Sequence, residues 1–105
     1  MNISQLTLMA QEMQANMARV QQELREATVE ATVGGGAVQV VMTGAQELRS
    51  VEIDPATVDP ADVELLQDLV FAAVSEALAQ SKRLAEEKMA AISGGLGLPG
   101  LPGLR

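Results

Sequence analysis

The chain has 105 residues and a formal net charge of -7, from 7 Lys and Arg against 14 Asp and Glu. This length indicates a single domain. Because the net charge is negative, the chain is not one of the strongly basic proteins that bind nucleic acid through their overall charge. Because the sequence holds no Cys and no His, it excludes disulfides, thiolate ligands, and Ser-His or Cys-His catalytic arrangements.

The N-terminal segment has neither a basic start nor the long apolar run of a signal peptide. No stretch approaches the roughly 18 uncharged apolar residues of a membrane span. We therefore expect a soluble cytoplasmic protein with no membrane partner. We also expect no small-molecule substrate.

Residues 4–26 contain no Gly or Pro and predict a long amphipathic helix, with Ser4 as its N-cap. Apolar residues recur at steps of 3 or 4, with a mean of 3.5, which is the spacing of a coiled-coil-like seam. The seam comprises Leu6, Met9, Met13, Met17, Val20, Leu24 and Ala27. Its Met stripe favours packing, although Met side chains can also grip varied partners.

Three short segments rich in β-branched residues follow, at 28–33, 37–43 and 48–53. Their Gly-containing connections of 3 to 5 residues predict an antiparallel meander. The predicted apolar faces comprise Val38, Val40 and Met42 in the second segment, and Val51 and Ile53, in line with Arg49, in the third.

Three consecutive glycines, Gly34 to Gly36, suggest either a phosphate-binding loop or a turn. A phosphate-binding glycine loop lies between a strand and a helix, and usually includes Lys and Ser or Thr. These glycines lie between two predicted strands, and no such residues follow them. A hairpin turn, whose left-handed positions suit glycine, is the favoured interpretation.

Pro55 ends the third strand after Asp54, and Asp59 to Asp62 then predict the start of a second long helix. Asp59 is the expected N-cap, with Pro60 at the first helical position. The helix is expected to run to about Ser93, with a C-cap at the two glycines that follow. Its predicted apolar face comprises Val63, Leu66, Val70, Ala73, Ala77, Leu84 and Met89.

Together these elements predict one α+β domain over 1–93 and a flexible tail, rich in Gly, Leu and Pro, over 94–105. So short a meander cannot cover two long helices, and their apolar seams would stay in water without a partner. We therefore expect a homodimer with protruding helical arms.

The acids Glu52, Asp54, Asp59 and Asp62 form the only dense acidic group. Paired carboxylates can act as acid and base or bind Mg²⁺, but helix capping and strand ends account for these positions better. We therefore predict no enzymatic activity, no metal site and no cofactor.

Basic residues gather late in the second helix, where 82–88 hold three bases and two acids, whereas 59–76 hold five acids and no base. Pairs of opposite charge four residues apart, Lys82 with Glu86 and Arg83 with Glu87, offer a purely local explanation. Bases also suit the C-terminal end of a helix.

Three strings resemble those of the YbaB/EbfC family of bacterial nucleoid-associated proteins. They are GAQELRSVEIDP at 44–55, LQDLVFAA at 66–73 and EKM at 87–89. The resemblance spans nearly the whole chain and implies a tweezer-like homodimer in the cytoplasm that binds duplex DNA with low or variable sequence preference. It further implies a role in nucleoid organisation, gene regulation or DNA protection, and no cofactor.

The first helix departs from the family, since Gln11, Gln14, Ala15 and Gln22 stand where members often have Lys. Phosphate contacts supply most non-specific affinity for DNA, so the remaining basic residues of the arms become the candidate DNA contacts. These candidates are Arg19, Arg25, Lys82, Arg83 and Lys88, and Arg49 on the sheet is a weaker one. The alternative function is a protein-interaction module whose Met- and Leu-lined arms hold a partner protein.

Overall fold

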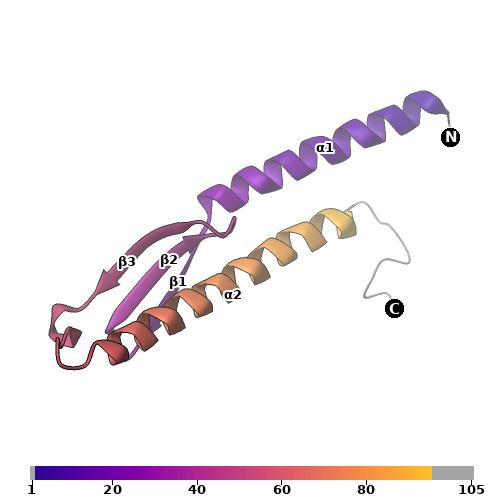
Figure 1. The fold of residues 1–105 in the computed structure, drawn as a ribbon. Coiled ribbons are helices and arrows are strands. Elements are labelled where there is room, and N and C mark those ends of the chain that lie inside the picture. The colour runs from indigo at the N-terminus through magenta and orange to yellow at the C-terminus, as the bar shows by residue number, and fades with distance from the viewer. Residues whose placement is uncertain (1, 96–105) are drawn as a thin grey trace, which may run out of the picture.

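A computed structural model describes residues 2–95 and shows an elongated molecule of 70 × 28 × 16 Å (Figure 1). The elements are α1 (Ile3–Glu26), β1 (Thr28–Val33), β2 (Val38–Thr43), β3 (Leu48–Ile53), the 3-10 helix η1 (Pro55–Thr57) and α2 (Val63–Gly95). This order confirms the predicted α+β fold. The predicted C-terminal tail lies outside the described residues, apart from Gly94 and Gly95 in α2.

The three strands form one antiparallel sheet in the order β1-β2-β3, which confirms the meander. Gly34, Gly35 and Gly36 have φ values of +64°, +66° and +101°, and Ala37 N–H donates to the carbonyl of Val33 at 3.0 Å. Such left-handed backbone costs glycine little, so the three glycines make the predicted hairpin turn.

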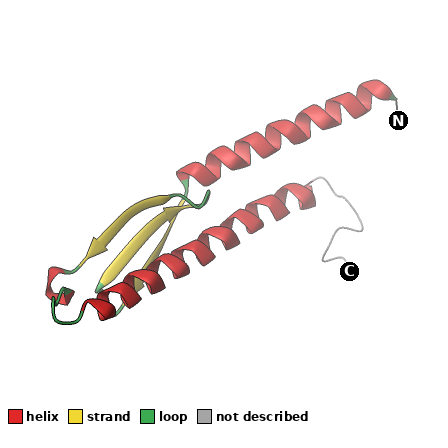
Figure 2. Cartoon of the chain, viewed as in Figure 1, coloured by secondary structure: helices red, strands yellow, loops and turns green. Residues whose placement is uncertain are grey.

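One face of the sheet is covered by α2, which packs against β1 and β2 (Figure 2). The core beneath it comprises Ala31, Ala37, Val38, Val40, Met42, Ala73 and Ala77. The predicted apolar face of the second strand is therefore confirmed. The opposite face bears mostly polar side chains, and there Gln39 Nε2 donates to Glu30 Oε1 at 3.0 Å.

The prediction that Arg49 lies in line with Val51 and Ile53 in the third strand is wrong. Ser50 pairs with Val41 and Leu48 pairs with Met42, so a bulge leaves Arg49 without a partner in β2. A bulge adds one residue to one strand and re-aims the local side chains. As a result, Leu48 rather than Arg49 stands opposite the buried Met42.

Both helices begin at caps other than those predicted. Asn2, not Ser4, caps α1, because its side chain accepts from Gln5 N–H at 2.8 Å and Gln5 Oε1 accepts from Asn2 N–H at 3.2 Å. Asp59 Oδ1 accepts from Ala61 N–H at 2.9 Å and closes a turn instead. Helix α2 starts only at Val63, where Asp62 Oδ1 accepts from Leu65 N–H at 3.2 Å.

The two helices extend beyond the sheet and lie side by side over part of their lengths (Figure 1). In α1 only Val20 and Leu24 are buried, whereas Leu6, Met9 and Met13 nearer its start are exposed. Among residues 2–95, no helix is both long and apolar enough to span a membrane.

Candidate nucleic-acid interface

The arms are joined to the sheet at Gly44, in the turn between β2 and β3. Its N–H donates to the carbonyl of Ala27 at 3.0 Å. A Cβ at this position would lie 2.7 Å from Leu24 Cδ2 and 3.1 Å from the Leu24 carbonyl oxygen. Real Cβ atoms essentially never come as close as 2.7 Å, so a larger residue would force Leu24 or the turn to shift. Glycine therefore allows the close approach of α1 to this turn.

Ser81 ties α2 to the same turn. It is fully buried, and its hydroxyl donates to the Thr43 carbonyl at 2.7 Å and accepts from Gln46 N–H at 3.2 Å. Gln46 has a φ of 61°, which a residue other than glycine rarely adopts. These hydrogen bonds hold that backbone in place and fix the direction in which α2 leaves the sheet.

Arg19 and Lys88 meet at Glu23, in a groove between the two arms. Arg19 Nη1 lies 2.9 Å from Glu23 Oε2, and Lys88 Nζ lies 3.3 Å from Glu23 Oε1. The hydrogen bond from Arg19, followed by that from Lys88, lowers the pKa of Glu23. Asn16, Val20, Ala91 and Ile92 line the rest of the groove.

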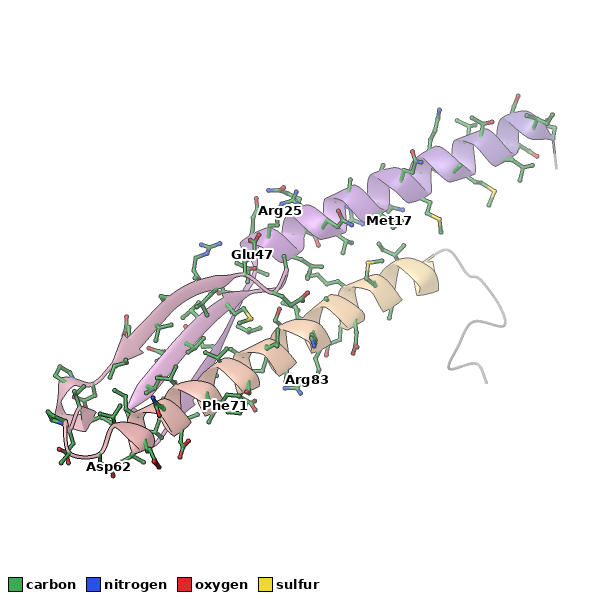
Figure 3. The ribbon with its side chains drawn as sticks, in the orientation of Figure 1. Met17, Arg25, Glu47, Asp62, Phe71 and Arg83 are labelled. Atoms are coloured by element: carbon green, nitrogen blue, oxygen red, sulfur yellow. The ribbon has the colours of Figure 1, made fainter. Side chains whose placement is uncertain are left out.

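Lys82 and Arg83 lie on α2, and both are exposed. The predicted pairs with Glu86 and Glu87 are absent from the three ion pairs of the described residues. Arg83 Nη2 instead lies 4.0 Å from Glu76 Oε2, which is nearer the start of α2. Figure 3 shows Arg83 on the side of α2 that faces away from α1. Within residues 2–92, Lys82 takes part in no ion pair.

Arg25 lies at the C-terminal end of α1, where it meets the sheet (Figure 3), and Arg49 reaches it from β3. Arg25 Nη2 donates to Gln22 Oε1, and Arg49 Nη2 donates to the carbonyl of Arg25 at 3.2 Å. Cations favour the C-terminal end of a helix because its carbonyl groups carry partial negative charge. Arg49 thus lies on the sheet, as predicted, but its guanidinium contacts the end of α1.

Charge is divided along the long axis. We define the sheet end as residues 28–43 and 50–76, and the arm end as 2–27, 44–49 and 77–95. The sheet end holds eight acids and no base, whereas the arm end holds six bases and six acids. The eight acids are Glu30, Glu52, Asp54, Asp59, Asp62, Glu64, Asp68 and Glu76. The negative excess of the described chain therefore lies wholly at the sheet end.

Three of the eight acids of the sheet end cap turns or helix starts. Asp54 Oδ1 accepts from Ala56 N–H at 3.0 Å at the start of η1. As described above, Asp59 closes a turn and Asp62 caps the start of α2. Within the described part of the chain, no three His, Cys, Asp or Glu side chains are placed to hold a metal ion together.

Residues 1–96 match the model of the YbaB/EbfC DNA-binding family. The chain belongs to this family. A nucleoid-associated protein of Acetivibrio thermocellus is 52% identical over 103 residues, covering 98% of this chain and 89% of the relative. One of Moorella thermoacetica is 57% identical over 86 residues, covering 82% and 83%.

This chain has the same fold as an uncharacterized protein from Helicobacter pylori whose crystal structure is known. The two superpose with a TM-score of 0.68 at 23% identity, over 91% of this chain and 97% of the other. This likeness concerns the fold alone. The arrangement of two long helices around a three-stranded sheet is thus common to both proteins.

Proposed function

We propose that the protein is a nucleoid-associated protein that binds duplex DNA with its arm end, as a homodimer and with low or variable sequence preference. Membership of a DNA-binding family supports this function. The observation that supports the arm end as the contact is the division of charge, because all six bases of residues 2–95 lie there. A duplex approaching the sheet end would meet only like charge.

The proposed contacts are the phosphates of the DNA backbone, which position a protein without reading sequence. Lys82 and Arg83 are the strongest candidates, since both are exposed. Among the ion pairs of the described residues, Lys82 has none, and Arg83 has one, to Glu76, at the long distance of 4.0 Å. Arg25 and Arg49 add two guanidinium groups where the arm meets the sheet. Arg19 and Lys88 complete the set, although both are held by Glu23.

The proposed homodimer forms through the sheet end. Val51 and Ile53 stand opposite the buried Val40 and Val38 and thus share their face of the sheet, yet they are 41% and 38% exposed. Phe71, on α2, is 75% exposed. Exposed large apolar side chains are typical of protein interfaces, and pairing at the sheet end leaves both arm ends free for DNA.

DNA binding is tested by the fluorescence anisotropy of a labelled duplex of about 30 bp at about 50 and 200 mM salt. We expect saturable binding that weakens steeply with salt, because phosphate contacts release counterions. No binding at the lower salt would contradict the proposed function and favour a partner protein for the exposed Met and Leu residues of α1.

The location of the contact is tested with two double variants that change the net charge equally. Lys82→Gln with Arg83→Gln removes two bases from the arm end, and Ala56→Glu with Ala61→Glu adds two acids to exposed positions of the sheet end. We expect about a tenfold loss of affinity from the first pair and much less from the second. Equal losses of affinity would mean that binding depends only on the net charge of the protein, which would contradict a contact located at the arm end.

The dimer is tested by sedimentation at micromolar concentration. We expect a dimer for the natural chain, a monomer for Phe71→Asp, and an unchanged dimer for Leu8→Asp. Leu8 is 60% exposed but lies on α1, away from the proposed contact. A natural chain that sediments as a monomer, or dissociation by both variants alike, would contradict pairing through the sheet end.

A further inference from the structure

We propose that Glu23 is an internal competitor of DNA phosphate, which occupies Arg19 and Lys88 until a phosphate group replaces it. This inference rests on the proposed DNA-binding function and concerns the regulation of the same site. It accounts for an arrangement that DNA binding alone leaves unexplained, in which two of the few basic side chains of the arms are already neutralised.

The geometry of the ion pairs supports this role. Each carboxylate oxygen of Glu23 takes one cation, Arg19 from α1 at 2.9 Å and Lys88 from α2 at 3.3 Å. A phosphate group offers the same kind of anionic oxygens to the same two cations. Two cations held on both sides of one anion in a groove are therefore arranged as a phosphate would need them.

The exposure of the three side chains makes the exchange feasible. The side chains of Arg19, Glu23 and Lys88 are 57%, 39% and 33% exposed, so a phosphate can reach them from solvent. Ion pairs as exposed as these are weak. Their separation costs little, whereas each new phosphate contact releases a counterion from DNA.

The carboxylate of Glu23 nevertheless opposes binding in two ways. It must leave both cations before a phosphate can contact them, and its own charge then remains near the incoming phosphate. Glu23→Gln removes both effects and keeps the size of the side chain. The matched control is Glu12→Gln, which makes the same change of charge at an exposed position of the same helix.

The test compares the affinities of the natural chain, Glu23→Gln and Glu12→Gln for the labelled duplex in the same anisotropy assay. We expect Glu23→Gln to bind about three- to tenfold tighter than the natural chain, and Glu12→Gln to stay within about twofold. If the two variants bind alike, the competitor role is refuted, while saturable binding by the natural chain still supports the proposed function.

A second set of variants separates competition from a change in the arms. Arg19→Gln with Lys88→Gln removes the two cations for which Glu23 competes. In that background Glu23→Gln is expected to raise the affinity by no more than the charge control Glu12→Gln does, within about twofold. A gain of about threefold or more that persists there would overturn the inference. If the natural chain shows no binding at low salt, the proposed function fails, and this inference fails with it.

Discussion

The two ends of the molecule differ in what holds them together and in the charge that they bear. The sheet end contains most of the buried apolar side chains and all of the negative excess. The arm end contains every base of the described residues, but in α1 only Val20 and Leu24 are buried. This difference teaches that most of the buried core and all of the described basic side chains lie in separate parts of a small acidic chain, so one can be altered without the other.

The joint between the two ends is made by few residues. Gly44 lets α1 approach the turn after β2, and Ser81 ties α2 to the carbonyl of Thr43 in that turn. Both helices are thus directed from one turn of the sheet. Variants at the core, at the joint and in the arms should therefore have different effects, which decrease in that order.

The largest effect on stability is expected in the core, where replacing a Met should cost far more than replacing a Met in the arm. Met42 is 4% exposed beneath α2, whereas Met9 on α1 is 49% exposed. Met42→Ala should lower the free energy of unfolding by about 2 to 4 kcal/mol through the cavity that it leaves. Met9→Ala should change it by less than about 0.5 kcal/mol.

Urea unfolding followed by circular dichroism measures both changes, because the chain has no Trp or Tyr for fluorescence. Equal losses for the two variants would mean that the start of α1 is buried against a partner in solution. The contrast between a packed sheet end and an open arm would then be wrong.

An intermediate effect is expected at the joint. Gly44→Ala should lower the free energy of unfolding by about 1 to 3 kcal/mol, because the new Cβ would overlap Leu24. Leu24→Ala removes Cδ2, the nearer of the two Leu24 atoms. The loss of stability in the double variant should therefore be smaller than the sum of the losses in the two single variants. Strictly additive losses would show that Gly44 and Leu24 do not contact.

The smallest effect is expected from the protonation of Glu23. Because Arg19 and Lys88 lower its pKa in the folded protein, its stabilising contribution is fully present above the pKa of the unfolded chain. The contribution is lost as the pH falls from about 4.3, the ordinary glutamate value, through the lower folded-state pKa. The difference in stability between the natural chain and Glu23→Gln should therefore shrink over that range, in urea titrations at several pH values. A difference independent of pH would contradict the ion pairs.

Local patterns in the sequence predict the elements but not the contacts that join them. The spacing of Met and Leu residues predicts α1, and alternation around Val38 and Val40 predicts β2. The role of Ser81 has no local signal, because its partner Thr43 is 38 residues away. The bulge at Arg49 is also hidden, since Arg49 fits the alternation of β3.

The candidate site shows the same limit. The spacing of four residues predicts ion pairs for Lys82 and Arg83 that do not form, because Arg83 lies near Glu76 instead. The same spacing does join Arg19 to Glu23, but the second cation, Lys88, is 65 residues from Glu23. A sequence pattern limited to one helix cannot reveal that two helices share an anion.

The most direct test of DNA binding at the arm end is to follow the backbone amide NMR signals of residues 2–95 while the duplex is added. We predict that the signals that shift most belong to residues 19–25 and 82–88, and that those of residues 59–76 stay nearly unchanged. Shifts concentrated in residues 59–76 or in the sheet would contradict the central claim that the arm end is the DNA-binding surface.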